Sequence, residues 1–480
     1  MKMRASVYVI AAMLYGFALS AVAGTIEEAN SQARQTIQAI MKEQRIPGLQ
    51  LAVIKDDRIV LSESYGMANV ENKVPATRTI RFPLNSATKA FTGVAMMQLA
   101  EAGQVDLDTP VSRYLDDLPP AWRDIRVRQL LAHTSGLPDI VNQQGDVEGG
   151  SEASAWKVAR ARPVAAPPGQ QFDYNQTNYA LLAQIISKQS RMPYERFITE
   201  RQFAVARMPL STFGDSYDLV PNAATIYAYA PRGTSAPDDG TRLSRWIYAI
   251  PYGLWAGGGI QTTADEVAHW LIALSKGRLV SQASLQRMWT PEKLNSGANG
   301  EWGAGWPVLR TTPELQVASI GGARAAFIVY PEQRLAVVVL TNLAGAHPQR
   351  FIPRIADFYK SAPGQATAAT APCVKMRSGA GSVCMKFSAP AIARAEQYGL
   401  HLADPFSVVK HKLAQQGWVI DRAYLSEDAP QASAAEEMVC GRGWDAVCST
   451  AFKLGNETLY LSMSGTNDGT PLISVETGRQ

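Results

Sequence analysis

Two pairs of strand-like segments, far apart in this 480-residue chain, constrain its fold most strongly. Residues 49–55 and 58–65 are apolar and β-branched around a short acidic turn, which predicts a hairpin. Residues 327–331 and 335–342 predict a second hairpin, whereas residues 85–290 have a mainly helical, loop-rich pattern. Strands from both ends can join one antiparallel sheet flanked by helices, so the sequence predicts an α+β fold.

Length and composition narrow the class of protein. The length favours roughly three units, and the hydrophobic content of 46% is ample for a large core. The formal net charge of +4 is small for this size, and no Lys/Arg cluster carries interleaved aromatic residues. A nucleic-acid partner is therefore not expected.

The region that follows the second hairpin predicts a separate domain. Residues 361–371 are rich in Ala, Thr, Pro and Gly, which is typical of a linker. Residues 372–480 then combine a helical run at 405–416 with strand patterns at 418–424 and within 450–464, and predict a small α+β domain. No motif reveals its role. A stabilising cap and a cell-wall- or partner-binding accessory are the alternatives.

Residues 1–23 have the pattern of a secretory signal peptide. Lys2 and Arg4 precede an uncharged apolar run, and small residues at 21–23 suit a cleavage site. The alternative is an uncleaved anchor, because the uncharged stretch approaches spanning length. The sequence predicts a periplasmic or secreted protein of residues 24–480 without a stable membrane span.

All four cysteines lie late in the chain, at positions 373, 384, 440 and 448. An exported protein can oxidise them, and pairing of nearest neighbours is one of three connectivities. A zinc site is the alternative, although the spacings do not resemble a C-x₂-C pair. The main region has no cysteine, so its nucleophile cannot be a thiol.

A candidate nucleophile and base stand three residues apart in Ser86-Ala87-Thr88-Lys89. An apolar helical pattern follows and ends at Gly103, which puts Ser86 near a helix N-terminus. Residues i and i+3 share a helix face, and free N–H groups at the N-terminus favour an alkoxide. Burial disfavours a charged amine, and a neutral amine can take the proton of a serine.

The tetrapeptide alone is weak evidence, because a second match occurs at Ser407-Val408-Val409-Lys410. That copy lies in the helical run 405–416 without any partner motif. We interpret it as structural. The case for Ser86 therefore depends on its surroundings.

Those surroundings resemble the serine β-lactamase and penicillin-binding-protein superfamily, above all its branch of class-C-like esterases and β-lactamase-related hydrolases. Ser86-x-x-Lys89 matches the first motif of that family. The resemblance covers about Ile26 to Tyr359. Further stretches that agree in order and spacing are Gly103–Val111, Val127–Pro138, Thr262–Asp265, Trp302–Trp306 and Val337–Asn342.

Two other family motifs match with departures. Tyr174 takes the tyrosine position of the second motif, whose oxygen helps to move the proton, but Gln176 stands where Asn is usual. In the third motif Ser319 stands where Lys or His is expected, which tilts the substrate away from β-lactams. Gly321 and Gly322 retain the glycine part, and family geometry implies that backbone N–H groups of Ser86 and Gly322 form the oxyanion hole.

The resemblance implies a three-layer α/β/α sandwich with an antiparallel sheet and an all-α subdomain, in a hydrolase domain of residues 24–360. It implies that Ser86 attacks an ester, amide or lactam and that Lys89 and Tyr174 share proton transfer. Cell-wall peptide is a further candidate substrate. The alternatives are a catalytically weak protein that binds cell-wall peptide or a partner, and transfer of the acyl group to an amine or alcohol.

Other chemistries lack their motifs. The chain has no G-x-S-x-G elbow for a Ser-His-Asp triad, and we interpret His133 as a structural hydrogen-bonding residue. It has no H-E-x-x-H or Walker loop. No metal or organic cofactor is expected.

Overall fold

A computed structural model gives the fold and divides the chain into a larger unit that ends near residue 361 and a smaller one after it. The predicted leader and linker lie outside the described residues. Among the residues described, no helix is both long and apolar enough to span a membrane. The described residues are 26–142, 147–229, 242–312, 314–360, 373–378, 381–386, 395–402, 404–420, 439–440, 447–455, 457–464 and 472–479.

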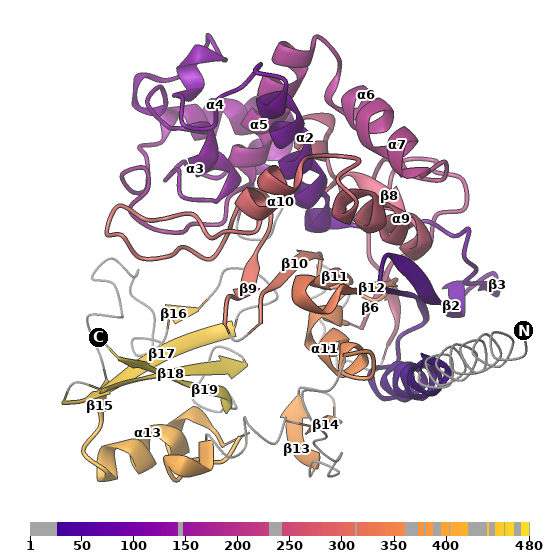
Figure 1. The fold of residues 1–480 in the computed structure, drawn as a ribbon, viewed down its shortest axis with the longest axis vertical. Helices are drawn as coiled ribbons and strands as arrows, with labels where there is room; N and C mark the ends of the chain where they lie inside the picture. Colours follow the sequence, from indigo (N-terminus) through magenta and orange to yellow (C-terminus); the bar gives the residue numbers. More distant parts are fainter. Residues whose placement is uncertain are drawn as a thin grey trace, which may run out of the picture. The chain divides into compact units, whose positions relative to one another are not determined.

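One antiparallel seven-stranded sheet organises the larger unit (Figure 1). It joins both predicted hairpins, because β1 pairs with β12 across the sequence gap between them. Two acidic residues with positive φ, Asp56 at 50° and Asp57 at 59°, make the tight turn of the first hairpin. In sheet order the strands are β3 (Val74–Pro75), β2 (Arg58–Asn69), β1 (Gly48–Lys55), β12 (Leu335–Thr341), β11 (Ala325–Tyr330), β10 (Gln316–Gly321) and β9 (Val308–Arg310).

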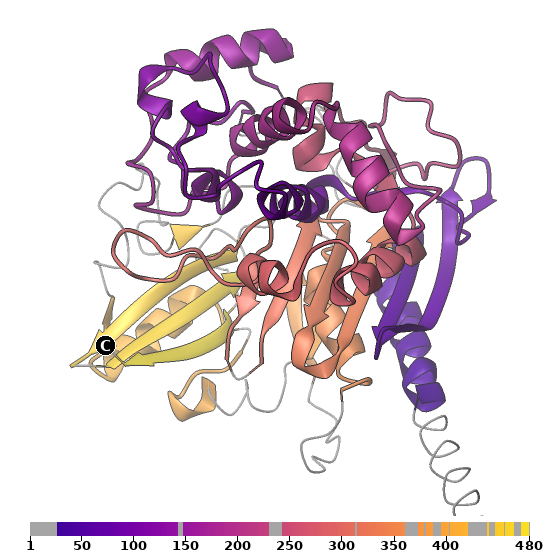
Figure 2. The same cartoon turned by 45° about the horizontal axis from the view of Figure 1, so that its top comes forward.

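Both faces of this sheet are covered. Along β12, Val337 and Val339 enter a core with the helix of residues 26–44 and with α11 (Ile352–Ala356). Val338, one position on, enters the other core, which holds α2 (Lys89–Glu101) and α9 (Ala264–Ser275). Since alternate strand residues point to opposite faces, the sheet is the middle layer of three (Figure 2). The predicted α+β sandwich is confirmed.

The residues between the two hairpins form the predicted helical subdomain. Its core is aromatic: Phe91 of α2 stacks on Trp270 of α9 at 3.9 Å between ring centroids. Its further helices are α3 (Val127–Leu131), α4 (Glu152–Ala161), α5 (Gln176–Ser190), α6 (Tyr194–Ile198), α7 (Ala204–Ala206), α8 (Trp255–Gly258) and α10 (Gln282–Met288). Its short strands are β4 (Phe82–Pro83), β5 (Thr212–Phe213) and β8 (Ile260–Thr262) in one sheet, with β6 (Tyr227–Ala228) and β7 (Ser244–Arg245) in another.

The smaller unit contains the predicted helix as α13 (Phe406–Gln415) and the predicted hairpin as β17 (Val447–Leu454) and β18 (Glu457–Ser464). The strand pattern at 418–424 appears as β15 (Val419–Ile420), which the buried Trp418 precedes, and residues 421–424 lie outside the described residues. The remaining strands are β13 (Cys373–Ser378), β14 (Gly381–Lys386), β16 (Val439–Cys440) and β19 (Leu472–Arg479).

The backbone register bears on the cysteines without deciding their pairing. Cys440 lies directly opposite Cys448 in the β16–β17 ladder. Cys373 lies opposite Lys386, two positions from Cys384. The disulfides stay a prediction, since these side chains are outside what the structure describes.

Candidate active site

The Ser86 turn joins the small sheet to α2. Ser86 lies near the N-terminus of α2, as predicted, in a 3₁₀ turn, η1 (Asn85–Thr88), that leads directly into that helix. Because a 3₁₀ turn has three residues, positions i and i+3 eclipse, which brings Ser86 and Lys89 onto the same line. Asn85 takes a left-handed φ of 47° just before Ser86, a conformation that costs energy in a non-glycine residue. Ser86 itself is partly exposed.

Lys89 is fully buried and its amine is completely engaged. Its Nζ lies 3.3 Å from Ser86 Oγ, 2.9 Å from Gln176 Oε1 and 2.9 Å from the carbonyl oxygen of Gly257. An ammonium would donate to all three. A neutral amine has two N–H donors and one lone pair, so it can donate to the two carbonyl oxygens and accept the Ser86 proton. The contacts therefore suit both states of a base that takes and returns one proton.

Two tyrosine rings lie next to the Lys89 amine. Lys89 Nζ lies 4.9 Å from the ring centroid of Tyr174 and 5.1 Å from that of Tyr179. Ring faces attract a cation at such distances. The Tyr174 ring thus lies beside the amine, and its side chain is partly exposed.

His133 fixes the segment that carries Tyr174. Its Nδ1 accepts from the backbone N–H of Asn175 at 3.0 Å and contacts Asn178 Nδ2 at 3.2 Å. Its carbonyl accepts from the N–H of Asp173 at 2.8 Å. Its ring packs on Tyr174 with centroids 4.4 Å apart. These are the contacts of a scaffold residue, in agreement with the interpretation from sequence.

The His133 imidazole stays neutral. Complete burial, and next the positive charge of Lys89, hold the pKa of His133 well below its usual value. Since Nδ1 accepts from Asn175, the proton belongs on Nε2, which has no hydrogen-bond partner among the described residues. The Trp302 ring lies nearly perpendicular to the imidazole at 4.7 Å, which suits an N–H···π contact.

Gln176 opens α5 and reaches the amine where the family usually has Asn. The N-cap of that helix is Asn175, whose side chain accepts from the Asn178 N–H at 3.2 Å. The Gln176 N–H donates to Asp139 Oδ1 at 3.0 Å. Burial raises the pKa of the Asp139 carboxyl to about 6, although the hydrogen bonds that this carboxyl accepts from backbone N–H groups lower its pKa.

The end of β10 lies directly against the Ser86 turn. A Cβ added to Gly321 would lie 2.8 Å from the Ser86 nitrogen and 1.8 Å from the Leu84 oxygen. Gly322 follows with φ +55°, which favours glycine. The structure thus brings Gly321 to the backbone of Ser86, and Gly322 to the side chains of Asn85 and Arg324. The oxyanion hole formed by the N–H groups of Ser86 and Gly322 stays a prediction.

The Ser319 side chain is buried and bonded to the protein, unlike a side chain that binds substrate. It is 1% exposed, and its hydroxyl donates to the Ala87 carbonyl at 3.1 Å. That bond ties β10 to η1. The side chain is thereby committed to the protein, while Ser86, Lys89, Tyr174, Gln176 and the two glycines converge.

Three further residues belong to the site. Gly257 supplies a carbonyl to Lys89, Asp139 anchors Gln176, and Arg324 lies beside Gly322. The sequence offered two signals: the Gly257-Gly258-Gly259 run, which indicates close backbone packing, and Arg324, a positive charge two residues after Gly322. Asp139 is reached only through long-range folding.

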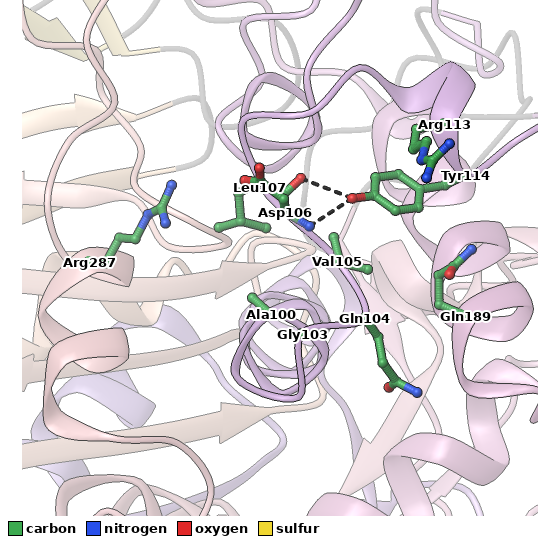
Figure 3. A pocket seen from close by; sticks show the side chains of 10 residues that line it. All are labelled: Ala100, Gly103, Gln104, Val105, Asp106, Leu107, Arg113, Tyr114, Gln189 and Arg287. Carbon is green, nitrogen blue, oxygen red and sulfur yellow. Dashed lines mark hydrogen bonds between the residues drawn. The ribbon is translucent and has the colours of Figure 1, made fainter.

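A separate cavity of about 720 Å³ opens at the other end of α2 (Figure 3). None of the candidate active-site residues lines this cavity. Figure 3 shows the Tyr114 hydroxyl turned to the Asp106 backbone there. Among the described residues no group of three or more His, Cys, Asp or Glu could hold a metal ion. The cavity is lined by Ala100, Gly103, Gln104, Val105, Asp106, Leu107, Arg113, Tyr114, Gln189 and Arg287.

The chain is similar to a known protein family and to individual known proteins. The Beta-lactamase family model matches residues 33–359. Protein flp of Staphylococcus aureus (strain N315) is 23% identical over 344 residues, which are 69% of this chain and 66% of flp. The putative penicillin-binding protein PbpX of Bacillus subtilis (strain 168) is 28% identical over 274 residues, 57% of this chain and 65% of PbpX. The chain thus spans just under two thirds of each relative.

Solved structures share the fold. EstCE1, a hydrolase with promiscuous acyltransferase activity, has a TM-score of 0.59 and 20% identity, and covers 70% of this chain and 99% of its own. The D-amino acid amidase from Ochrobactrum anthropi SV3 has a TM-score of 0.56 and 23% identity, and covers 69% of this chain and 98% of its own.

Proposed function

We propose a serine acyl-hydrolase activity for this chain, which belongs to the Beta-lactamase family. One observation carries the proposal: a fully buried lysine amine lies 3.3 Å from the hydroxyl of a partly exposed serine. Apart from that hydroxyl, both partners of the amine are carbonyl oxygens. Among the described residues, Ser86 is thus the one hydroxyl that is hydrogen-bonded to this amine.

The reaction we propose is acyl transfer in two halves. Ser86 Oγ attacks the substrate carbonyl carbon, and its proton passes to Lys89 Nζ or to the Tyr174 oxygen. The N–H groups of Ser86 and Gly322 hold the negative oxygen. Collapse breaks the bond to the alcohol or amine, which leaves with the proton. Water then attacks the acyl carbon and gives a proton to the same base. The bond from the acyl carbon to Ser86 Oγ breaks, Oγ takes that proton from the base, and the acid is released.

Esters or peptide-like amides are the substrates we favour over lactams. Ser319 offers no cation for a substrate carboxylate, and its hydroxyl already donates to the Ala87 carbonyl. Two structural neighbours are a hydrolase with promiscuous acyltransferase activity and a D-amino acid amidase, which supports this choice. Cell-wall peptide stays a candidate because PbpX is described as a putative penicillin-binding protein.

A substrate panel tests the proposal. Purified protein is assayed with p-nitrophenyl esters of increasing acyl length, D-amino acid amides, a D-Ala-D-Ala peptide and a chromogenic cephalosporin. We expect ester turnover that is lost in Ser86→Ala and kept in Ser407→Ala. Ser407 is the matched control, since it opens the second S-x-x-K and lies exposed on α13.

The rival function is binding without turnover. The departures at Gln176 and Ser319 favour it, because both alter the family's substrate contacts. A protein that binds muropeptides tightly and hydrolyses no member of the panel would be such a binder. Export to the periplasm or medium is a separate proposal, supported by residues 1–23 alone.

A further inference from the structure

A buried arginine lies in the turn that carries the second N–H of the expected oxyanion hole. Arg324 follows Gly322 by two residues and is 5% exposed. Charged side chains are seldom buried, because removal from water is costly. Its place beside the reacting centre therefore needs a reason.

Arg324 locks the turn through its side chain and its backbone. Its Nε donates to the Gly322 carbonyl at 3.1 Å, and its backbone N–H donates to the Gly321 carbonyl at 3.0 Å. Its own carbonyl accepts from the N–H of Thr341 at 2.8 Å and from the Thr341 hydroxyl at 3.0 Å. Gly322 and Ala323 both have left-handed φ, 55° and 53°. These bonds hold Gly322 and Ala323 in one conformation, and only in Ala323 is that conformation strained.

The Arg324 guanidinium also places a fixed positive charge beside Gly322. A Cβ on Gly322 would lie 2.7 Å from Arg324 Nε and 2.8 Å from its Nη2. A Cβ added to the neighbouring Gly321 would lie 2.8 Å from the Ser86 nitrogen. The Arg324 guanidinium and the Ser86 backbone thus lie against two adjacent residues, Gly322 and Gly321. Charges in a dry site interact far more strongly than in water.

We infer that Arg324 is the positioning residue of the oxyanion hole, which aligns the Gly322 N–H and supplies the positive charge that Ser319 lacks. This inference rests on the proposed acyl transfer. The family resemblance puts a basic residue at position 319, and here that position is a buried serine bonded to Ala87. Arg324 delivers the charge from the far side of the same turn.

Arg324→Met and Arg324→Lys test the inference. We expect Arg324→Met to lower kcat for p-nitrophenyl acetate by 10- to 100-fold, with KM within threefold. Affinity for phenylboronic acid, whose serine adduct is an anionic tetrahedral boronate, falls in parallel. Arg324→Lys keeps the charge and recovers part of both losses. Arg334→Met is the matched control, because Arg334 stands at the other end of β11 and pairs at the surface with Asp56 and Asp57.

Each outcome decides the matter. Equal losses of kcat and boronate affinity in the Met and Lys variants, in proportion to their lowered melting temperatures, overturn the inference. Arg324 would then have a structural role only. An Arg324→Met protein with wild-type kcat also overturns it. If Arg324→Met does not fold, Arg324→Gln against Arg324→Lys gives the same comparison. A wild-type protein that neither turns over esters nor binds the boronate overturns the proposed function itself.

Discussion

Gly321→Ala is the substitution whose effect the structure allows us to calculate best. The new methyl group would lie 1.8 Å from the Leu84 oxygen, whereas real Cβ atoms keep at least 3.0 Å from such atoms. The difference shows that β10 and the Ser86 turn must separate by about 1.2 Å. The three nearest atoms, of Leu84, Ala87 and Ser86, are all backbone, so no side chain can rotate away. A misplacement of about 1 Å costs roughly 100-fold in rate.

We therefore expect Gly321→Ala to lower kcat for ester hydrolysis by about 10²–10³ and stability by about 1–3 kcal/mol. Steady-state kinetics and thermal unfolding measure the two effects. Gly103→Ala is the control: it lies at the opposite end of α2, has φ +68°, and has nothing within 4 Å of its added Cβ. It should lose stability and keep kcat. A folded Gly321→Ala protein with kcat within fivefold of wild type would refute the reasoning.

Three further substitutions probe the base, its scaffold and a buried acid. Lys89→Met should lower kcat by about 10²–10⁴ with any ester, as stopped-flow acylation would show. His133→Ala leaves the N–H of Asn175 without its acceptor and should cost at least about 2 kcal/mol in a denaturant titration. Asp139 has its pKa raised from 3.8 to about 6, so the folded state binds more protons between these values. Stability should fall over that pH range by at most about 3 kcal/mol, and Asp139→Asn, which still accepts from Gln176, should abolish the slope.

The parts of the fold that the sequence predicts are those set by local pattern. Alternation and turn residues predict both hairpins, and their apolar strands predict one shared sheet. The pattern also predicts that Ser86 and Lys89 meet, because residues three positions apart lie on the same face of any helical turn. It does not predict the 3₁₀ geometry of η1, which depends on the left-handed Asn85 and on packing against Gly321.

The residues that the sequence did not reveal act across long stretches of chain. Lys89 meets Gly257 through the packing of α8 on the Ser86 turn. Asp139 meets Gln176 only because a loop folds over the start of α5. Ser319 was expected to face substrate from its motif position, yet its hydroxyl points to Ala87. Side-chain direction at a strand end depends on such neighbours, and a single sequence does not display them.

The most direct measurement maps covalent labelling by a fluorophosphonate with peptide mass spectrometry. The probe reacts only with a serine whose hydroxyl a neighbouring base has activated. The account predicts one labelled peptide, with the adduct on Ser86, and loss of all label in Ser86→Ala while Ser407→Ala labels normally. Label on another serine, or label that persists in Ser86→Ala, would contradict the claim that the Lys89 amine activates Ser86.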